Sequence, residues 1–550
     1  MAILGLIGCQ ELGPTAAPAP REALAVTTLA LPGDSTAWTS FATDARGAYS
    51  GVELGDGSVL VCGGSISTSP SFVVTCNRLS FDGALHSQTF PLPEARTAAT
   101  LSLLPDNRVL LAGGKDATAK ALTARVSLPL AGWADNQNIW GMPEGNSASP
   151  SPRAGHTATL LDSSIVLIGG DAGVKQVSSI DVRSDQGDWS KFDPSGLPGA
   201  LATIATRNAH SATLLKSQPG SAARVLILGG YSQTQGGYLS SGFIFSLPNA
   251  ITPIAPMPEA RMAHTATLLD DGSVLVVGGE GASEAYLGTA LRYYPDQNSW
   301  ASAGSTFPRK HHAAVRLGSD VVIAGGISNG WPTAGEGFLG GSEDAPTNPK
   351  TVQRYNPVSN AWASASNLRQ GRRDFQLFAL DQTHLLAVGG ANPRGTLATS
   401  EVFTASALGQ PSSDPYSCVS GQIADGVCCN VACDGPCRWC NDPAAPGTCR
   451  LVSGETPNQN GCESHLQCSA GMCPARCDAG NPCQAGFFCR SDGKCQEANQ
   501  IGAACNANSE CADGAPCVDG VCCQSACSGS CEACNQPFRA GLCLPLAKGA

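Results

Sequence analysis

Short apolar runs that end in paired glycines recur along residues 22–410. In the first of them, Val-Leu-Val-Cys at 59–62 runs directly into Gly63 and Gly64. Runs of this length, rich in branched side chains and bounded by turn residues, predict short β-strands. The seven glycine pairs are Gly63-Gly64, Gly113-Gly114, Gly169-Gly170, Gly229-Gly230, Gly278-Gly279, Gly325-Gly326 and Gly389-Gly390. They therefore define a sevenfold repeat with a period near 50 residues.

A second β-rich run precedes each glycine pair and is opened by an arginine. The seven openers are Arg46, Arg96, Arg153, Arg207, Arg261, Arg309 and Arg372. In the fifth repeat, Asp270-Asp271-Gly272 separates the two runs, which is a strong hairpin signal. A variable loop then leads to a strand over 289–294 and to an outer strand beginning near Trp300. Each repeat is thus predicted to hold four short antiparallel strands.

A four-stranded unit with this period is typical of a β-propeller blade. The glycine pair, the spaced Tyr and Trp residues and the arginine opener resemble kelch repeats and the propeller of galactose oxidase. The resemblance covers about 390 residues. We therefore expect an all-β chain with a seven-bladed kelch-type propeller over 22–410, followed by small disulfide-rich modules. Only six fourth strands lie between repeats, so residues 25–31 with Trp38 are expected to close the ring beside residues 400–403.

The repeated residues are interpreted as structural. The arginines have several donors and are expected to bridge carbonyls of neighbouring blades. The glycine pairs are expected to supply backbone freedom and close approach. Four histidines share one register and would suit a ring of metal ligands: His156, His210, His264 and His312. Tyr49, Ala99 and Phe375 take the same register in other blades, which favours packing, so neither a metal nor a cofactor is expected.

Copper-radical oxidation is the alternative that the resemblance to galactose oxidase raises. That family uses copper, two tyrosines, two histidines and a Cys–Tyr crosslink, with one tyrosine directly before a ligand histidine. No Tyr-His dipeptide occurs in this sequence. The two cysteines of the propeller, Cys62 and Cys76, lie on adjoining predicted strands and are expected to form a disulfide. No catalytic residue is predicted, and the chain is expected not to be an enzyme.

Charge narrows the class of partner. The 33 Lys and Arg residues against 44 Asp and Glu residues give a net charge of −11, which argues against a nucleic-acid partner. The expected ligand is a protein or a glycan held by the propeller loops. A structural spacer in a surface array is the remaining alternative.

The C-terminal segment 411–550 is dense in cysteine. Of the 26 cysteines, all but Cys9, Cys62 and Cys76 lie in 418–543, which is typical of a disulfide scaffold in an oxidising compartment. The cysteines of 428–449 return at 522–543, each displaced by 94 residues, so the modules are a tandem duplication whose second copy looks truncated. They resemble cysteine-rich modules appended to bacterial surface proteins. Zinc is the alternative, because Cys437-x-x-Cys440 has zinc-knuckle spacing.

The N-terminal segment 1–21 combines a short apolar stretch with a Pro- and Ala-rich tether. Residues 6–9, Leu-Ile-Gly-Cys, resemble a bacterial lipobox, which implies lipidation of Cys9. The segment departs from that family because no Lys or Arg precedes the apolar stretch. We expect a protein of the bacterial cell envelope, at the outer surface or extracellular, that contacts the membrane through its lipid anchor only.

Overall fold

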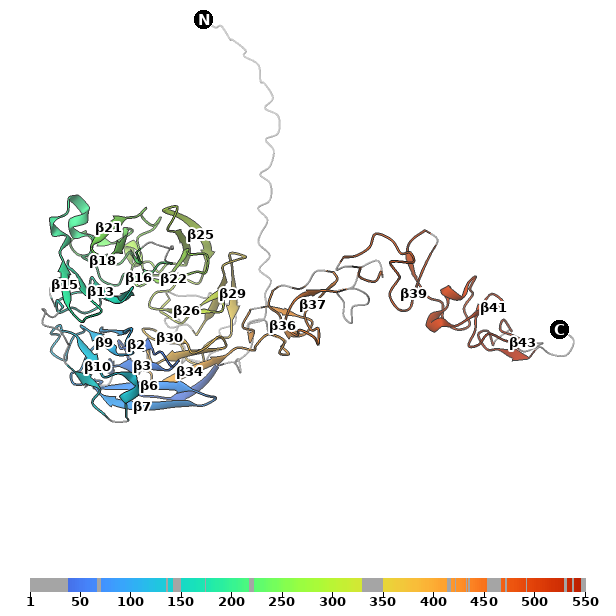
Figure 1. The fold of residues 1–550 in the computed structure, drawn as a ribbon, viewed down its shortest axis with the longest axis horizontal. Coiled ribbons are helices and arrows are strands. Elements are labelled where there is room, and N and C mark those ends of the chain that lie inside the picture. The colour runs from blue at the N-terminus through green and yellow to red at the C-terminus, as the bar shows by residue number, and fades with distance from the viewer. Residues whose placement is uncertain are drawn as a thin grey trace, which may run out of the picture. The chain divides into compact units, whose positions relative to one another are not determined.

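The computed structural model describes residues 38–545, except 67–70, 135–136, 142–149, 174, 217–221, 329–349, 413–416, 421, 432, 434–435, 453–465, 470–471, 491, 529–531 and 537–538. Seven four-stranded antiparallel sheets form a ring, with their first strands around the centre (Figure 1). The predicted all-β, seven-bladed propeller is confirmed.

The blades have the following strands, from the first to the fourth. Blade 1 is β2 (Ser50–Glu53), β3 (Val59–Cys62), β6 (Thr75–Phe81) and β7 (Leu85–Pro91); blade 2 is β8 (Thr100–Leu103), β9 (Val109–Ala112), β10 (Arg125–Ser127) and β11 (Trp140–Gly141). Blade 3 is β12 (Thr157–Leu161), β13 (Ser164–Ile168), β14 (Ile180–Arg183) and β15 (Trp189–Phe192); blade 4 is β16 (Ser211–Leu214), β17 (Arg224–Leu228), β20 (Gly242–Ser246) and β21 (Ala250–Pro253). Blade 5 is β22 (Thr265–Leu268), β23 (Val274–Val277), β24 (Thr289–Tyr294) and β25 (Ser299–Ser305); blade 6 is β26 (Ala313–Leu317), β27 (Asp320–Ala324), β28 (Val352–Asn356) and β29 (Ala361–Ala365). Blade 7 is β30 (Gln376–Ala379), β31 (His384–Val388), β34 (Thr399–Thr404) and β1 (Trp38–Ala42).

Short elements decorate the ring. Three two-stranded hairpins stand in the loops after the glycine pairs: β4 (Ser65–Ile66) with β5 (Ser71–Phe72), β18 (Tyr231–Ser232) with β19 (Gly237–Tyr238), and β32 (Ala391–Asn392) with β33 (Gly395–Thr396). Among the described residues of the ring, the 3-10 turns are η1 (Leu130–Gly132), η2 (Pro194–Gly196), η3 (Gly199–Thr203) and η4 (Ala282–Glu284).

The core lies between blades, which explains why the second strands are apolar at consecutive positions. Both faces of a blade are covered by its neighbours, so a central strand buries successive side chains instead of alternating ones. All four residues of β23 are buried, and Leu275 and Val277 pack with Val321 and Ile323 of the next blade.

The ring is closed by the N-terminal strand. β1 pairs antiparallel with β34, placing Trp38 opposite Phe403 and Ala42 opposite Thr399. The Trp38 side chain is 1 % exposed, and its Nε1 donates to the carbonyl of Ser366 at 2.8 Å. The predicted closure by an N-terminal outer strand is confirmed, but the strand begins at Trp38: residues 400–403 pair with residues 38–41, C-terminal to the position that we predicted. Residues 25–31, which we expected to contribute, lie outside the described residues.

The cysteine-rich segment consists of two-stranded hairpins joined by disulfides. The hairpins are β35 (Ile423–Ala424) with β36 (Val427–Cys428), β37 (Arg438–Trp439) with β38 (Arg450–Leu451), β39 (Phe487–Cys489) with β40 (Cys495–Glu497), β41 (Cys517–Val518) with β42 (Val521–Cys522), and β43 (Glu532–Ala533) with β44 (Leu544–Pro545). The 3-10 turns η6 (Asn508–Glu510) and η7 (Ala512–Gly514) precede β41.

Ten disulfides join described cysteines of this segment: Cys418–Cys428, Cys429–Cys440, Cys433–Cys449, Cys437–Cys468, Cys477–Cys489, Cys483–Cys495, Cys505–Cys517, Cys511–Cys522, Cys523–Cys534 and Cys527–Cys543. The pairs Cys429–Cys440 and Cys433–Cys449 recur as Cys523–Cys534 and Cys527–Cys543, so the duplicated sequence has duplicated connectivity. Because these sulfurs are bonded to one another, they offer no thiolates for the alternative zinc site. Within the described residues, no helix has the length and apolarity that crossing a membrane requires.

Candidate functional site

The side chains of the seven repeat arginines are buried and bond within their own blade. Arg309 is fully buried, and its Nη1 donates to the carbonyls of Gly325 (3.0 Å) and Thr351 (3.2 Å). Each of the other six likewise donates to the carbonyl of its own blade's first paired glycine and to a carbonyl at, or just before, the start of the third strand. Our expectation that these side chains bridge neighbouring blades is therefore wrong. The arginine stands at the start of the first strand, where the second strand ends, so its side chain runs along its own sheet.

Neighbouring blades are joined by the arginine backbone instead. In every blade, the N–H of the second paired glycine donates to the arginine carbonyl of the next blade, at 2.8–3.0 Å, and Gly390 to Arg46 completes the circle. The close approach requires glycine. A Cβ on Gly278, whose φ is +63°, would stand 2.5 Å from the carbonyl oxygen of Arg309. The glycine pairs thus have the expected backbone conformation and close contact.

Each of the four histidines that share one register contacts a hydroxyl group of the preceding blade. The Nε2 atoms of His156, His210, His264 and His312 lie 2.8–2.9 Å from the hydroxyls of Thr100, Thr157, Ser211 and Thr265. Among the described residues, their buried Nδ1 atoms have no hydrogen-bond partner. An unpaired N–H costs more than an unpaired acceptor, so Nε2–H donates to the hydroxyl oxygen and Nδ1 carries no proton.

Burial sets the charge of these imidazoles. Desolvation, followed by the nearby Arg153 and Arg261, lowers the pKa of His156 and of His264 to about 3. Desolvation also lowers the pKa of His210 and His312 well below the ordinary value. The four side chains are neutral at pH 7 and act as packing and hydrogen-bonding groups, as Tyr49 does in blade 1, where its hydroxyl donates to the carbonyl of Val388.

Cys62 and Cys76 form a disulfide within blade 1. They stand directly opposite each other on β3 and β6, and both are buried. Their sulfurs are therefore committed to each other and unavailable for a Cys–Tyr crosslink.

One face of the propeller, here called the loop face, carries the loops that follow the glycine pairs. In each blade, the residue after the second glycine pairs with the residue after the arginine, as Glu280 does with Met262 and Ile327 with Lys310. This bridge holds the base of every loop at the same height in the ring. The variable part of each loop thus begins on a common, rigid platform.

Polar side chains connect these loop bases across the seams between blades. Lys115 of blade 2 and Asp171 of blade 3 form an ion pair at 2.7 Å. Gln176 of blade 3 donates from Nε2 to the carbonyl of Tyr231 in blade 4 at 2.9 Å. At the seam between blades 6 and 7, His311 Nδ1 lies 2.8 Å from a carboxylate oxygen of Asp374, and both side chains are about one-third exposed.

The richest part of the loop face is a group of aromatic and charged side chains on blades 4 to 6, which we call the Tyr–Lys cluster. It consists of Tyr231, Tyr238, Glu280, Tyr286 and Lys310. The rings of Tyr231 and Tyr238 meet edge to face at 5.7 Å. Lys310 Nζ lies 2.7 Å from Glu280 Oε2 and 4.7 Å from the centre of the Tyr286 ring.

The charges of this cluster influence one another. Desolvation by burial and the carboxylates of Glu280 and Glu284 raise the pKa of Tyr238. Desolvation opposes the ammonium form of Lys310, but the hydrogen bond and charge of Glu280 outweigh it and raise the pKa of Lys310. The cluster therefore presents three partly buried tyrosines beside an ion pair.

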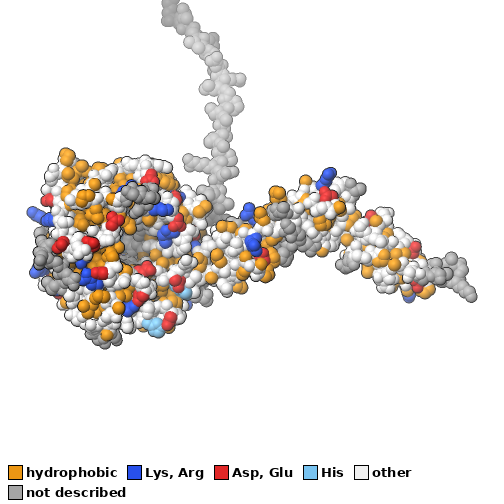
Figure 2. All heavy atoms as spheres, in the orientation of Figure 1, with side chains coloured by type: hydrophobic (Ala, Val, Ile, Leu, Met, Phe, Trp, Pro, Cys, Tyr) orange, Lys and Arg blue, Asp and Glu red, His pale blue; other side chains and the backbone are white. Residues whose placement is uncertain are grey.

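Sequence reasoning missed these residues because they do not repeat. A usable signal exists nevertheless: Lys115, Asp171, Tyr231 and Glu280 all directly follow a glycine pair. Figure 2 shows that Lys and Arg side chains lie interspersed with Asp and Glu on the visible face of the propeller.

Comparison with curated proteins gives partial matches. The chain is 32% identical to Kelch-like protein 9 of Mus musculus over 146 residues, covering 26% of this chain and 22% of that protein. It is 29% identical to Kelch-like protein 36 of Bos taurus over 183 residues, 33% of this chain and 27% of that protein. Kelch domain-containing protein 3 of Bos taurus is 23% identical over 258 residues, 43% of this chain and 62% of that protein. No model of a known protein family matches the chain.

The ring is a seven-bladed β-propeller, and the chain that forms it is similar in sequence to kelch proteins. The chain spans only about a quarter of the length of the two Kelch-like proteins it matches. The cysteine-rich segment is described by its own disulfides.

The buried histidines make the stability of the propeller sensitive to acid. Because their pKa is lowered in the folded state, the unfolded chain binds more protons below pH 6.5, and stability falls as pH drops from 6.5 towards 3. At pH 5 the loss is on the order of 1–2 kcal/mol for each such histidine. The double variant His156→Phe, His264→Phe should therefore show a flatter decline of Tm between pH 7 and pH 4.

Phenylalanine is the suitable replacement because Phe375 fills this register in blade 7, packed against Gly325 as His156 packs against Gly113. His86→Gln is the control: His86 lies on β7 in an exposed pair with Asp82, at 2.8 Å, and an exposed pair contributes little to stability, so this variant should change the profile of Tm against pH far less. A double variant that declines as steeply as the parent chain would contradict the prediction.

Proposed function

We propose that this protein is an exported, lipid-anchored, non-catalytic binding protein whose loop face receives a protein partner. The observation that carries the proposal is the Tyr–Lys cluster, held on a rigid ring. Tyrosine supplies much of the binding energy at protein interfaces, because it combines a large contact area with few rotatable bonds. The seam contacts fix these side chains before a partner arrives, which lowers the entropic cost of association.

The arrangement of the loop face favours a binding role over the alternative role of a structural spacer. A spacer needs only a stable ring, and the arginines, the glycine pairs and the interblade core already supply one. The loop-face side chains add little to that core, since the rings of Tyr231, Tyr238 and Tyr286 are only partly buried. Their placement is explained by contact with another molecule.

A panning experiment tests the proposed face. Displayed protein and peptide libraries are selected against the immobilised full chain, and the selected binders are measured on single variants. Lys310→Glu reverses one charge of the Tyr–Lys cluster, and Tyr238→Ala removes one ring. We expect each variant to weaken most selected binders by about tenfold or more, the scale of an interface hot spot.

The matched control is Val358→Ala, in the turn between β28 and β29, where the side chain is 91% exposed. That turn joins a third to a fourth strand and so lies on the opposite face from the loops. Binders that ignore both loop-face variants, or that respond to Val358→Ala instead, would refute the loop face as the binding surface.

Export and anchoring are the second part of the proposal. The disulfides of the cysteine-rich segment form and persist in oxidising compartments, and residues 6–9 resemble a lipobox. Cys9 itself lies outside the described residues. A lipid at Cys9 would hold the propeller at the cell envelope by a tether.

Metabolic labelling with a fatty-acid analogue in a bacterial host tests the anchor. The parent chain should incorporate label and Cys9→Ser should not, while Cys62→Ser, which alters a cysteine of the propeller, should label like the parent. Equal labelling of the parent chain and Cys9→Ser would overturn the anchor without affecting the loop-face proposal.

A further inference from the structure

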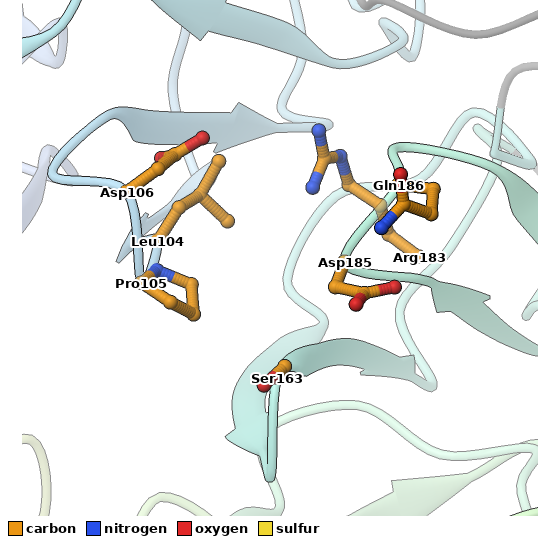
Figure 3. Close-up of a pocket in the computed structure, with 7 residues that line it drawn as sticks. All are labelled: Leu104, Pro105, Asp106, Ser163, Arg183, Asp185 and Gln186. Carbon is orange, nitrogen blue, oxygen red and sulfur yellow. The ribbon is translucent and has the colours of Figure 1, made fainter.

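A pocket of about 320 Å³ opens on the face opposite the loop face, between blades 2 and 3 (Figure 3). Leu104, Pro105 and Asp106 of the β8–β9 turn form one side. Ser163 of the β12–β13 turn and Arg183, Asp185 and Gln186 at the end of β14 form the rest. Its volume is at the lower end of small-molecule sites, so it suits a ligand of monosaccharide size.

Arg183 breaks the pattern of its own repeat register. Arg183 lies on the third strand, opposite the second-strand residue that stands four places before the first paired glycine. The third-strand residue at this position is uncharged in the other six blades: Leu79, Ser127, Phe245, Tyr293, Tyr355 and Phe403. In blades 5 and 6 the tyrosine is fully buried, and its ring packs at a tilt against the tryptophan opposite it on the fourth strand. Blade 3 retains that tryptophan, Trp189, but places Arg183 opposite it.

The substitution leaves a charge where the other blades pack apolar or aromatic groups. Arg183 is 3% exposed, and its Nη1 donates to the carbonyl of Ser184 at 3.3 Å. In the neighbouring blade the described third and fourth strands have three and two residues, and the pocket lies beside this blade. Figure 3 shows the guanidinium extending from β14 towards the turn that carries Leu104 and Asp106.

The polar groups around Arg183 define the ligand chemistry. A guanidinium matches a carboxylate with two parallel hydrogen bonds. The carboxylates of Asp106 and Asp185 accept from hydroxyls, whereas the Gln186 amide and the Ser163 hydroxyl both donate and accept. Asp106 is also bonded by Arg108 Nε at 2.7 Å, so the pocket is not strongly anionic. One carboxylate surrounded by several hydroxyls satisfies this whole set.

We propose that this pocket binds an acidic sugar, with the sugar carboxylate on Arg183 and the ring hydroxyls on Asp185, Gln186 and Ser163. The site is independent of the loop face, and it needs neither a protein partner nor the lipid anchor.

Calorimetric titration of the full chain with sodium D-glucuronate, D-glucose and sodium acetate tests the proposal. Glucuronate should bind at least about tenfold more tightly than either glucose or acetate, since only glucuronate carries both the carboxylate and the hydroxyls. Glucose binding equally well would overturn carboxylate recognition, and acetate binding equally well would overturn recognition of the hydroxyls. Absence of glucuronate binding would overturn the whole proposal.

Arg183→Tyr is the decisive variant, because it restores the residue that blades 5 and 6 carry at this register. It should fold with an unchanged or higher Tm and lose glucuronate affinity by about tenfold or more. Lys191→Gln removes an exposed charge from β15 of the same blade and should bind like the parent chain. If Arg183→Tyr does not fold, Arg183→Lys keeps the charge but loses the fork, and unchanged affinity in that variant would refute the assignment.

Discussion

The hydrogen bond from the second paired glycine of one blade to the arginine carbonyl of the next is the contact on which the ring depends. It occurs at all seven seams, including the seam between the last blade and the first. Because the donor must approach backbone to backbone, both glycines are required, and the arginine must stand at a set distance before the first strand. The glycine pair and the arginine recur in every repeat because together they form this one interblade contact.

The arginine side chain supports this contact by satisfying carbonyls that would otherwise be buried without partners. Arg207 and Arg309 do this with carbonyl and hydroxyl groups and with little help from carboxylates, and burial lowers the pKa of each to about 9. The guanidinium tolerates this burial because its rigid fork reaches two strands at once. Because the second and third strands are held together at the glycine pair, the residue that follows this pair has a defined position in every blade. The side chains of the loop face are positioned by these residues.

The repeat motif allowed the blades, the number of blades and the closing strand to be predicted, because each of these follows from local spacing. The arginine bonds were mispredicted, since sequence spacing does not say whether a side chain runs along its own sheet or across a seam. The Tyr–Lys cluster was missed for a different reason: Tyr238, Glu280 and Lys310 come from three blades and meet only once the ring is closed. Arg183 could be recognised as exceptional only after the strand registers were known, because only the registers identify which residue of each third strand is equivalent to it.

Amide hydrogen exchange of the seven second glycines tests the central claim most directly. If each seam carries the same contact and the ring is closed, Gly390 should be as well protected as Gly114, Gly170, Gly230, Gly279 and Gly326, and all should exchange only through global opening of the propeller. Gly64 should behave alike, because its partner Arg96 is equally buried. Fast exchange at Gly390, with slow exchange at the others, would show that the seam between blades 7 and 1 opens on its own and would contradict the account.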